Sequence, residues 1–269
     1  MPVRLTSILF QVEDVNAMAY FWGALVESWR PEPAGDGALR FVPSEEDGSQ
    51  VDLVLVPGAS VKTGKNRLHL DLNTWNYPGD REALPLNGAQ ALDIGQGELV
   101  PWTVFADQEG NEFCLLKPRE RYHNSGAIAA IVVDCADPDS LAGFWSSATG
   151  WKLVESDAGF ASLRVPGGVG IPARGPFLEF CRVAQRSRNT GRVSLRLESF
   201  WPHQHEADLA ALVARGARVL RQTTRESGEV SCSILADPEG NEFRVAVPVW
   251  PPPAPQPRGR AAHGPALRL

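Results

Sequence analysis

The sequence of 269 residues is poor in cysteine, with only four, and none of them forms a Cys-x-x-Cys pair. So few cysteines cannot build a disulfide framework, so we expect four reduced thiols in a cytoplasmic protein. Long apolar runs are also missing, because no segment reaches the roughly 18 residues of a membrane span. The N-terminus shows no charged-then-apolar leader. We therefore expect neither membrane insertion nor secretion.

An excess of basic charge is lacking too. The formal net charge is −6, with acidic and basic residues interspersed, whereas proteins that bind duplex nucleic acid usually present a basic face. Familiar catalytic patterns are absent as well: there is no P-loop, no Gly-x-Gly-x-x-Gly after a strand, no Gly-x-Ser-x-Gly and no His-Glu-x-x-His. A content of 43% hydrophobic and 22% charged residues is that of an ordinary globular protein.

What the sequence does contain is a long internal repeat. Residues 104–113 (VFADQEGNEF) return as residues 234–243 (ILADPEGNEF), and Phe21-Trp22 returns as Phe144-Trp145. Residues 67–72 (RLHLDL) return as residues 192–197 (RVSLRL). A repeat of this length exceeds the roughly 20–50 residues of a solenoid unit, so it indicates two domains, residues 2–118 and residues 126–248.

The segments outside the two repeats are polar or compositionally biased. Residues 119–125 (RERYHNS) form a polar linker between the repeats, and residues 251–269 are rich in Pro, Arg and Ala. This tail has no apolar periodicity, so it cannot bury enough surface to offset its ordering entropy. We expect it to be disordered.

Each repeat itself contains a smaller unit twice. In the first repeat, strand-like residues 6–12 precede an amphipathic helix over residues 17–27, and strands follow near residue 29 and at 38–42 and 51–56. The pattern restarts at residues 67–72, with a short helix over residues 79–87 and strands at 91–94, 102–105 and 113–117. The second repeat follows the same order, with helices over residues 139–148 and 204–215. Each repeat is therefore predicted to be βαβββ–βαβββ, an α+β fold with mixed, mainly antiparallel sheets.

This architecture and its motifs resemble the vicinal oxygen chelate (VOC) superfamily of glyoxalase I, bleomycin-resistance proteins and extradiol dioxygenases. The matching motifs are Asp14 before Phe21-Trp22, residues 64–72 (GKNRLHLDL), residues 100–114 and their counterparts in the second repeat. The resemblance covers residues 2–248 and implies two tandem glyoxalase-like domains. In such domains two βαβββ units curl their sheets around a cleft, and a fold of this kind does not fix the function.

Metal-dependent members of this superfamily place four metal ligands in the cleft. Carried onto this sequence, the four positions hold Ser7, Val54, His69 and Cys114 in the first repeat and Ala130, Glu179, Ser194 and Arg244 in the second. If each repeat folds on itself, these depleted sets should not hold a catalytic metal. Some relatives instead build each cleft from units of two different domains.

Pairing of units across the two repeats would change the prediction of whether the chain can hold a metal. It would join His69, Cys114 and Glu179 in one cleft, a possible site for one divalent metal such as zinc. Ser7, Val54, Ser194 and Arg244 would share the other cleft. Whether the units pair within or across the repeats stays open at this point.

Several residues on cleft strands are candidates for ligand binding or proton transfer. His69 and Glu179 are the candidate catalytic bases, His69 because an imidazole titrates near neutral pH and Glu179 because apolar neighbours should raise its pKa. A hydrogen-bonded sheet histidine and a carboxylate paired with an arginine are the structural alternatives. The candidate ligand-binding residues are Ser7, Asp71, Trp102, Cys114, Ser194 and Arg244.

The remaining aromatic and histidine residues are expected to be structural. Trp22 and Trp145 fall on amphipathic helices and should be core residues, whereas Trp102 on a cleft strand could stack on a flat ligand. His203 and His205, at the start of a helix, point in different directions and are expected at the surface.

Two functions are compatible with these features. The first is metal-independent binding of a hydrophobic or aromatic small molecule, of the drug-sequestering type and without a cofactor. The second is a lyase or isomerase acting on a carbonyl-containing small molecule, with or without a divalent metal in a cross-domain cleft. We expect a small-molecule ligand, no nucleic-acid or membrane partner, and a monomeric pseudo-dimer or a homodimer.

Overall fold

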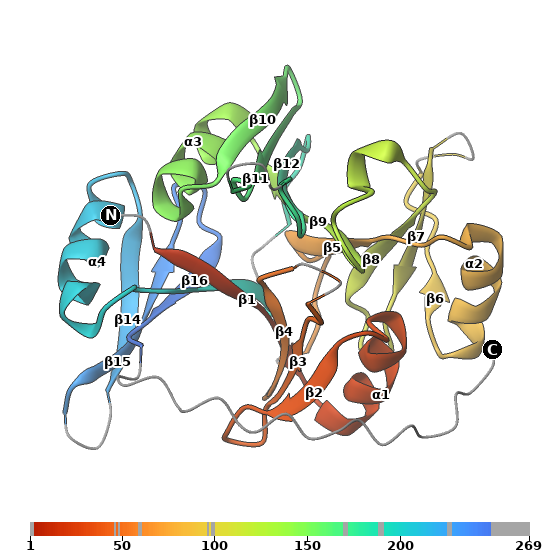
Figure 1. Cartoon of the computed structure of the whole chain (residues 1–269), viewed down its shortest axis with the longest axis horizontal. Coiled ribbons are helices and arrows are strands. Elements are labelled where there is room, and N and C mark those ends of the chain that lie inside the picture. The colour runs from red at the N-terminus through yellow and green to blue at the C-terminus, as the bar shows by residue number, and fades with distance from the viewer. Residues whose placement is uncertain are drawn as a thin grey trace.

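The computed structural model describes residues 3–45, 47, 49–58, 61–95, 97, 100–168, 172–187, 191–224 and 228–248. The predicted disordered tail, residues 251–269, lies outside these residues. Within them the chain forms two eight-stranded mixed sheets with four α-helices (Figure 1). The predicted α+β fold with mixed sheets is confirmed.

The first sheet, sheet A, has the strand order β14-β15-β16-β13-β1-β4-β3-β2. Four of its strands come from the first quarter of the chain: β1 (Arg4–Val12), β2 (Arg30–Pro33), β3 (Leu39–Val42) and β4 (Asp52–Pro57). The other four come from the last third of the chain: β13 (Val193–Glu198), β14 (Arg218–Thr224), β15 (Val230–Ala236) and β16 (Glu242–Ala246). Helices α1 (Val15–Leu25) and α4 (His205–Val213) belong to these two units.

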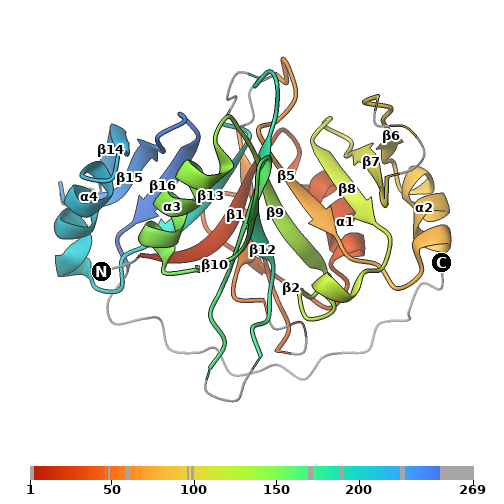
Figure 2. The ribbon, with the colours of Figure 1, turned by 90° about the horizontal axis from the view of Figure 1, so that it is seen from above.

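The second sheet, sheet B, has the order β10-β11-β12-β9-β5-β8-β7-β6. It combines β5 (Leu68–Leu72), β6 (Gln90–Ala91), β7 (Trp102–Ala106) and β8 (Glu112–Leu116) with β9 (Ile128–Cys135), β10 (Lys152–Asp157), β11 (Phe160–Arg164) and β12 (Phe177–Arg182). Helices α2 (Tyr77–Leu86) and α3 (Pro138–Thr149) belong to these units. Figure 2 separates the two sheets, with β14, β15 and β16 on the left and β6, β7 and β8 on the right.

Each sheet thus joins one unit of the first repeat to one unit of the second. The seams are antiparallel: β1 pairs with β13 in sheet A, and β5 pairs with β9 in sheet B. The sequence left this pairing open, and the structure shows that units are exchanged between repeats. Consequently His69, Cys114, Ala130 and Glu179 share sheet B, while Ser7, Val54, Ser194 and Arg244 share sheet A.

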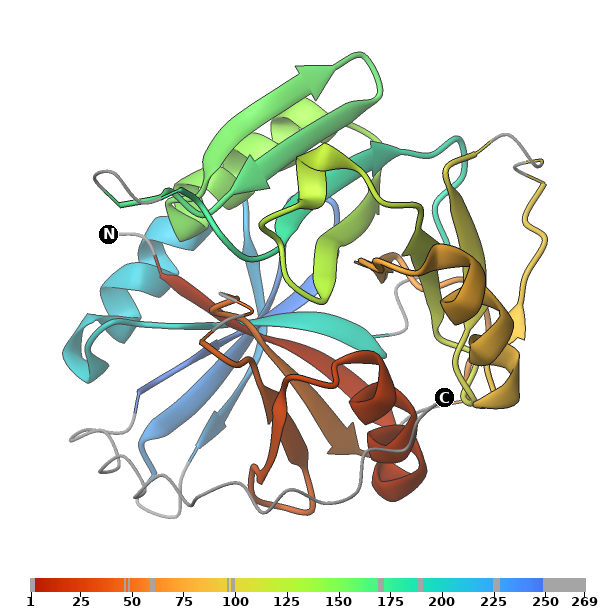
Figure 3. The ribbon, with the colours of Figure 1, turned by 45° about the vertical axis from the view of Figure 1, so that its right-hand side comes forward.

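The helices pack on the two sheets through one continuous apolar core. Trp22 on α1 and Trp145 on α3 are 0% and 2% exposed, so both predicted core tryptophans are confirmed. The Trp22 ring contacts Phe113 of β8 at 5.5 Å, and Trp145 contacts Phe243 of β16 at 5.2 Å. The core joins side chains of all four units, and the helices lie towards the periphery of the strands in Figure 3, with α1 red, α2 gold, α3 green and α4 cyan.

The repeated Asp-x-Glu-Gly-Asn motif is a turn that its own side chains stabilise. Asp107 accepts hydrogen bonds from the backbone N–H of Glu109 and of Asn111, and from the indole of Trp22. Gly110 has φ +79° in this turn, a conformation that glycine adopts without steric cost. Asp237 makes the equivalent contacts in the second repeat, including one to Trp145.

The third residue of each turn ties together the two units of its own repeat. Glu109 accepts hydrogen bonds from the backbone N–H of Glu13 and Asp14, just before α1. Glu239 does the same for Ala136 and Asp137, just before α3. Since the strands of these units pair with the other repeat, the turns supply a link within each repeat.

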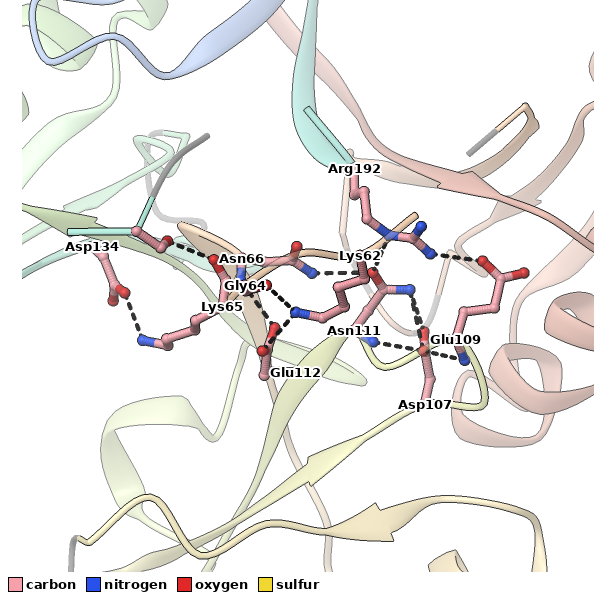
Figure 4. Close-up of polar contacts among 11 residues, drawn as sticks. Lys62, Gly64, Lys65, Asn66, Asp107, Glu109, Asn111, Glu112, Asp134 and Arg192 are labelled. Carbon is pink, nitrogen blue, oxygen red and sulfur yellow. Dashed lines mark hydrogen bonds and ion pairs between the residues drawn. The ribbon is translucent and has the colours of Figure 1, made fainter. Parts of the chain in front are cut away.

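Two arginines then connect the repeats at these turns. Arg192, 1% exposed, donates to Asn111 Oδ1 at 3.2 Å and to Glu109 Oε2 at 2.8 Å (Figure 4). Arg67 occupies the equivalent place in the first repeat and donates to Asn241 Oδ1 and to the Glu239 carbonyl. The contacts of the two arginines are related by the approximate symmetry of the two repeats.

Helix α4 carries one departure from prediction. His205 was expected at the surface, but it is only 4% exposed. Its ring nitrogens lie 3.3 Å from Ser199 Oγ and 3.1 Å from Ser233 Oγ. Two serines supply hydrogen-bond partners inside the sheet, and the helix pattern alone does not reveal them. Among the described residues no helix has the length and apolar character needed to span a membrane.

Candidate functional site

The predicted site residues of sheet B lie on the side opposite its helices, which we call face B. Core residues such as Leu70 and Ile131 point to the helix side, so strand alternation places their neighbours on face B. In the pairing register, Asp71 lies beside both Ala130 and Cys114. Val132 lies between His69 and Glu179. The unit exchange therefore gathers five predicted positions on one face.

His69, Asp71 and Cys114 form the compact part of this set. One donor atom from each residue lies within 4.8 Å of the other two. His69 Nε2 is 3.6 Å from Asp71 Oδ1, and Cys114 pairs with Asp71 in the strand register. His69 Nδ1 and Asp71 Oδ1 are buried without a hydrogen-bond partner among the described residues. Unsatisfied buried polar atoms of this kind indicate a place for a ligand, a water or an ion.

Burial controls the charge of this cluster. Loss of solvent, and to a smaller extent the Lys65 ammonium, lowers the pKa of His69 to about 3. Loss of solvent, together with the negative charge of Glu179, raises the pKa of Asp71 to about 7. The expectation that His69 titrates near neutral pH is therefore not met, because the ring is desolvated. Asp71 is the residue of this cluster whose pKa suits proton transfer at neutral pH.

Glu179 lies on the same face but has partners of its own. Its Oε1 accepts a hydrogen bond from Arg121 at 2.9 Å and from the Tyr122 hydroxyl at 3.1 Å. The predicted rise of its pKa through burial is confirmed, with Arg121 opposing that rise. The predicted pairing with an arginine is confirmed too, so Glu179 is a buried, ion-paired carboxylate. The predicted metal set was His69, Cys114 and Glu179, whereas the group of three close ligand atoms in the structure is His69, Asp71 and Cys114.

Sequence reasoning missed the role of the linker between the repeats. Residues Glu120–Tyr122 form a short 3-10 helix that lies on face B. The Tyr122 side chain is 4% exposed and packs with Ala130, Phe177 and other apolar residues of this face. Arg121 lies over the rings of Phe177 and Tyr122. The one hint in the sequence was an aromatic residue inside a segment that is otherwise polar.

Beside this filled region, an open groove lies at the β7 edge of sheet B, between residues of face B and residues of helix α2. The groove has a volume of about 530 Å³, and its lining includes Tyr77, Arg81, Trp102, Val104 and Lys117. Trp102 packs against the apolar residues of face B that include Val104 and Cys114. Val104 pairs with Cys114, the strand neighbour of Asp71. The groove therefore lies one strand away from Cys114, and its lining includes none of the three cluster residues.

A larger groove of about 730 Å³ lies elsewhere, with residues of α1, α2 and Trp75 in its lining. It contains none of the predicted site residues.

The corresponding face of sheet A, which we call face A, has a different chemistry. Ser7, Val54 and Ser194 are buried there, and Arg244 is half-buried. No group of three or more metal-ligating side chains is found on face A among the described residues. The metal-position residues of face A do not fit a divalent cation, and Arg244 would repel one.

The comparisons with known proteins agree with this fold. The family model of the glyoxalase-like domain matches the chain twice, at residues 7–116 and 130–246. The chain belongs to the glyoxalase-like domain family, within the VOC superfamily. A comparison with curated protein sequences gives no match.

Solved structures with the same fold are distant in sequence. Glyoxalase I from Zea mays superposes with a TM-score of 0.57 at 15% identity, covering 91% of this chain and 92% of that one. A mutant of the same enzyme gives a TM-score of 0.63 at 13% identity, covering 91% and 92%. A putative dioxygenase from Bacillus subtilis subsp. subtilis str. 168 gives 0.59 at 13% identity, covering 91% and 84%. At these identities the likeness concerns the fold.

Proposed function

We propose that this chain binds a small aromatic molecule in the groove beside Trp102, without a resident metal. The observation that carries the proposal is the lining of this groove, which combines the rings of Tyr77 and Trp102 with the cations of Arg81 and Lys117. Its residue Val104 is also the strand neighbour of Cys114 in the buried polar cluster. Small-molecule sites are typically concave and mostly apolar, with a few polar groups that orient the ligand.

The positions that hold metal in the superfamily support binding over metal catalysis. Ala130 has no ligand atom, and Glu179 is already paired with Arg121 and Tyr122. A metal taking Glu179 would have to displace a guanidinium from a carboxylate whose side chain is 4% exposed, and breaking a buried ion pair is costly.

Each wall of the groove would recognise a different part of the ligand. The Trp102 ring offers a surface on which a flat ligand can stack. Arg81 and Lys117 line the same groove and can pair with an acidic substituent. Val104 of the groove pairs with Cys114, the strand neighbour of Asp71, and Asp71 with a pKa of about 7 can donate or accept a hydrogen bond at neutral pH.

The test uses the uncharged fluorescent aromatic probe N-phenyl-1-naphthylamine. We expect its emission to rise on binding and Trp102→Ala to weaken binding by about 1 to 3 kcal/mol, the range for an aromatic contact in a binding pocket. Trp75→Ala is the matched control, since Trp75 lines the larger groove. Weaker binding in the Trp75 variant with unchanged binding in the Trp102 variant would contradict the proposal.

The three-donor cluster supports a second candidate, a lyase or isomerase that holds a divalent metal on face B. His69, Asp71 and Cys114 offer nitrogen, oxygen and sulfur ligands of the types that zinc accepts. The two unpartnered buried atoms, His69 Nδ1 and Asp71 Oδ1, fit such a group. A bound metal would supply a Lewis acid for a carbonyl-containing substrate.

Metal analysis distinguishes the two candidates. After growth with added zinc, the first proposal predicts no stoichiometric metal and no change of melting temperature with a chelator. About one metal per chain, lost in both His69→Ala and Asp71→Asn and kept in Glu179→Gln, would favour the second candidate.

A further inference from the structure

Face A carries a row of arginines that the proposed function does not use. In the register of sheet A, Arg221 of β14 lies opposite Ile234, which lies opposite Arg244 of β16. Arg244 lies directly beside Arg196 of β13, and Arg196 lies opposite Ser7 of β1. Neighbouring strands are about 4.8 Å apart, so three guanidinium groups share one line across adjacent strands.

The three side chains point to the same side of the sheet. Leu195 and Leu197 belong to the core, so Arg196 between them is on face A. Phe243 and Val245 place Arg244 on face A in the same way. Gln222 donates to Ser233, which contacts the buried His205 on the helix side, so its neighbour Arg221 is on face A as well.

Among the described residues none of the three arginines lies in an ion pair or a side-chain hydrogen bond. Across the sheet, Asp52 lies opposite Ser7, is paired with Arg40 and also feels the charge of Arg196. Burial, together with the charges of Arg221 and Arg196, lowers the pKa of Arg244, whereas Cys232 and Glu242 oppose this shift. Like charges opposite one another destabilise a sheet, so a bound anion would relieve this repulsion.

We propose that face A is an anion-binding site for the carboxylate or phosphate group of a small molecule, centred on Arg244 and Arg196. Arginine matches both groups because its planar fork donates two parallel hydrogen bonds. Ser7 and Ser194 are buried on the same face. Ser7 lies opposite Arg196 in the register, and Ser194 lies two residues before Arg196 on the same strand. Their hydroxyls are further hydrogen-bond donors. This site is separate from the groove on face B, so either proposal can fail alone.

Inorganic phosphate and malonate are the two probes, each titrated by calorimetry and by melting temperature against sodium chloride of equal ionic strength. We expect at least one of them to bind and to raise the melting temperature beyond the chloride control. The arm that responds shows whether the group recognised is a phosphate or a carboxylate. Because hydrogen bonds to charged groups contribute strongly, Arg244→Gln and Arg196→Gln should each weaken binding about tenfold or more.

Two variants guard against a trivial explanation. Arg182→Gln removes the same charge from an exposed position on sheet B and should leave binding unchanged. Arg244→Gln should also melt at a higher temperature than the parent protein without added anion, because it relieves the repulsion within the row. Equal responses to chloride and to both probes, or full binding by Arg244→Gln, would overturn the proposal.

Discussion

The hydroxyl of Tyr122, in the segment that joins the two repeats, lies 3.1 Å and 3.3 Å from the two carboxylate oxygens of Glu179. Arg121, the preceding residue, completes the contact with an ion pair to Glu179 and a second one to Glu155. The linker is thus a part of face B, where it covers Glu179 and packs in the same apolar cluster as Val104 and Cys114.

Replacing Arg121 should destabilise the protein, because the buried carboxylate of Glu179 would lose its ion-pair partner. We expect Arg121→Gln to lower the free energy of unfolding at pH 7 by about 3 kcal/mol, the lower end for breaking a buried pair. Without Arg121 the pKa of Glu179 rises further above its unfolded value. The deficit should therefore shrink as pH falls and Glu179 takes up a proton. Urea unfolding at pH 7 and pH 5 measures the difference, and an equal loss at both values would contradict it.

His69 and Asp71 should impose opposite pH dependences on stability. The pKa of His69 is about 3 in the folded state, below the unfolded 6.5, so its contribution rises with pH between these values. The pKa of Asp71 is about 7 in the folded state, above the unfolded 3.8, so its contribution falls with pH across that range. Between about pH 4 and 6.5 the two contributions largely cancel.

Single substitutions should separate the two contributions. In Asp71→Asn the free energy of unfolding should rise with pH between pH 4 and 6.5, by up to about 1.4 kcal/mol per unit. In His69→Gln it should fall with pH in the same interval. Denaturant unfolding at four or five pH values checks this, and parallel profiles for the two variants would show that the pair does not titrate as described.

The two faces should not bind the same aromatic ligand equally well. Face B offers Asp71 and a neutral His69 near an aromatic groove, whereas face A offers an unpaired cationic row. We expect one aromatic probe molecule per chain, with binding weakened by His69→Ala and unaffected by Ser194→Ala. Calorimetric stoichiometry is the measurement. Two equivalent sites would contradict this prediction. So would a loss of probe binding in Ser194→Ala with unchanged binding in His69→Ala, because it would place the aromatic ligand on face A.

The two arginines that connect the repeats should contribute different amounts to the free energy of unfolding. Arg192 is buried and pairs with the carboxylate of Glu109, so Arg192→Ala should cost about 3 to 5 kcal/mol. Arg67 donates to carbonyl and amide oxygens, so Arg67→Ala should cost less, about 1 to 3 kcal/mol. Equilibrium unfolding of both variants tests the order, and a larger loss for Arg67 would reverse the assignment.

Much of this fold could be predicted from the sequence because local patterns and the repeat agree. The helix at Trp22 and its copy at Trp145 follow from apolar periodicity, and the Asp-x-Glu-Gly-Asn turn is fixed by its own side chains. The partner of each unit could not be predicted, since both repeats present equivalent strands. The unit β5–β8 could share a sheet with β1–β4 of its own repeat or with β9–β12 of the other repeat. The assembled sheets show that it pairs with β9–β12.

The candidate site was predictable only as a set of positions. Strand alternation put Asp71 on the face of His69, but the desolvation that lowers the pKa of His69 and raises that of Asp71 depends on packing from both repeats. The linker was treated as a connection because most of its residues are polar. Burial of Tyr122 against Ala130 and Phe177 depends on contacts that no local pattern encodes.

The exchange of units also sets an order for assembly on the ribosome. Sheet B joins β5–β8 to β9–β12, which follow directly in the chain, so its strands can meet once about two thirds of the protein has been synthesised. Sheet A must wait, because Arg4 of β1 meets Glu198 of β13 across 194 residues. Until then the free edge of β1 is exposed, and unpaired edges of this kind favour aggregation. Expression of residues 1–118 alone would leave that edge of β1 without its β13 partner.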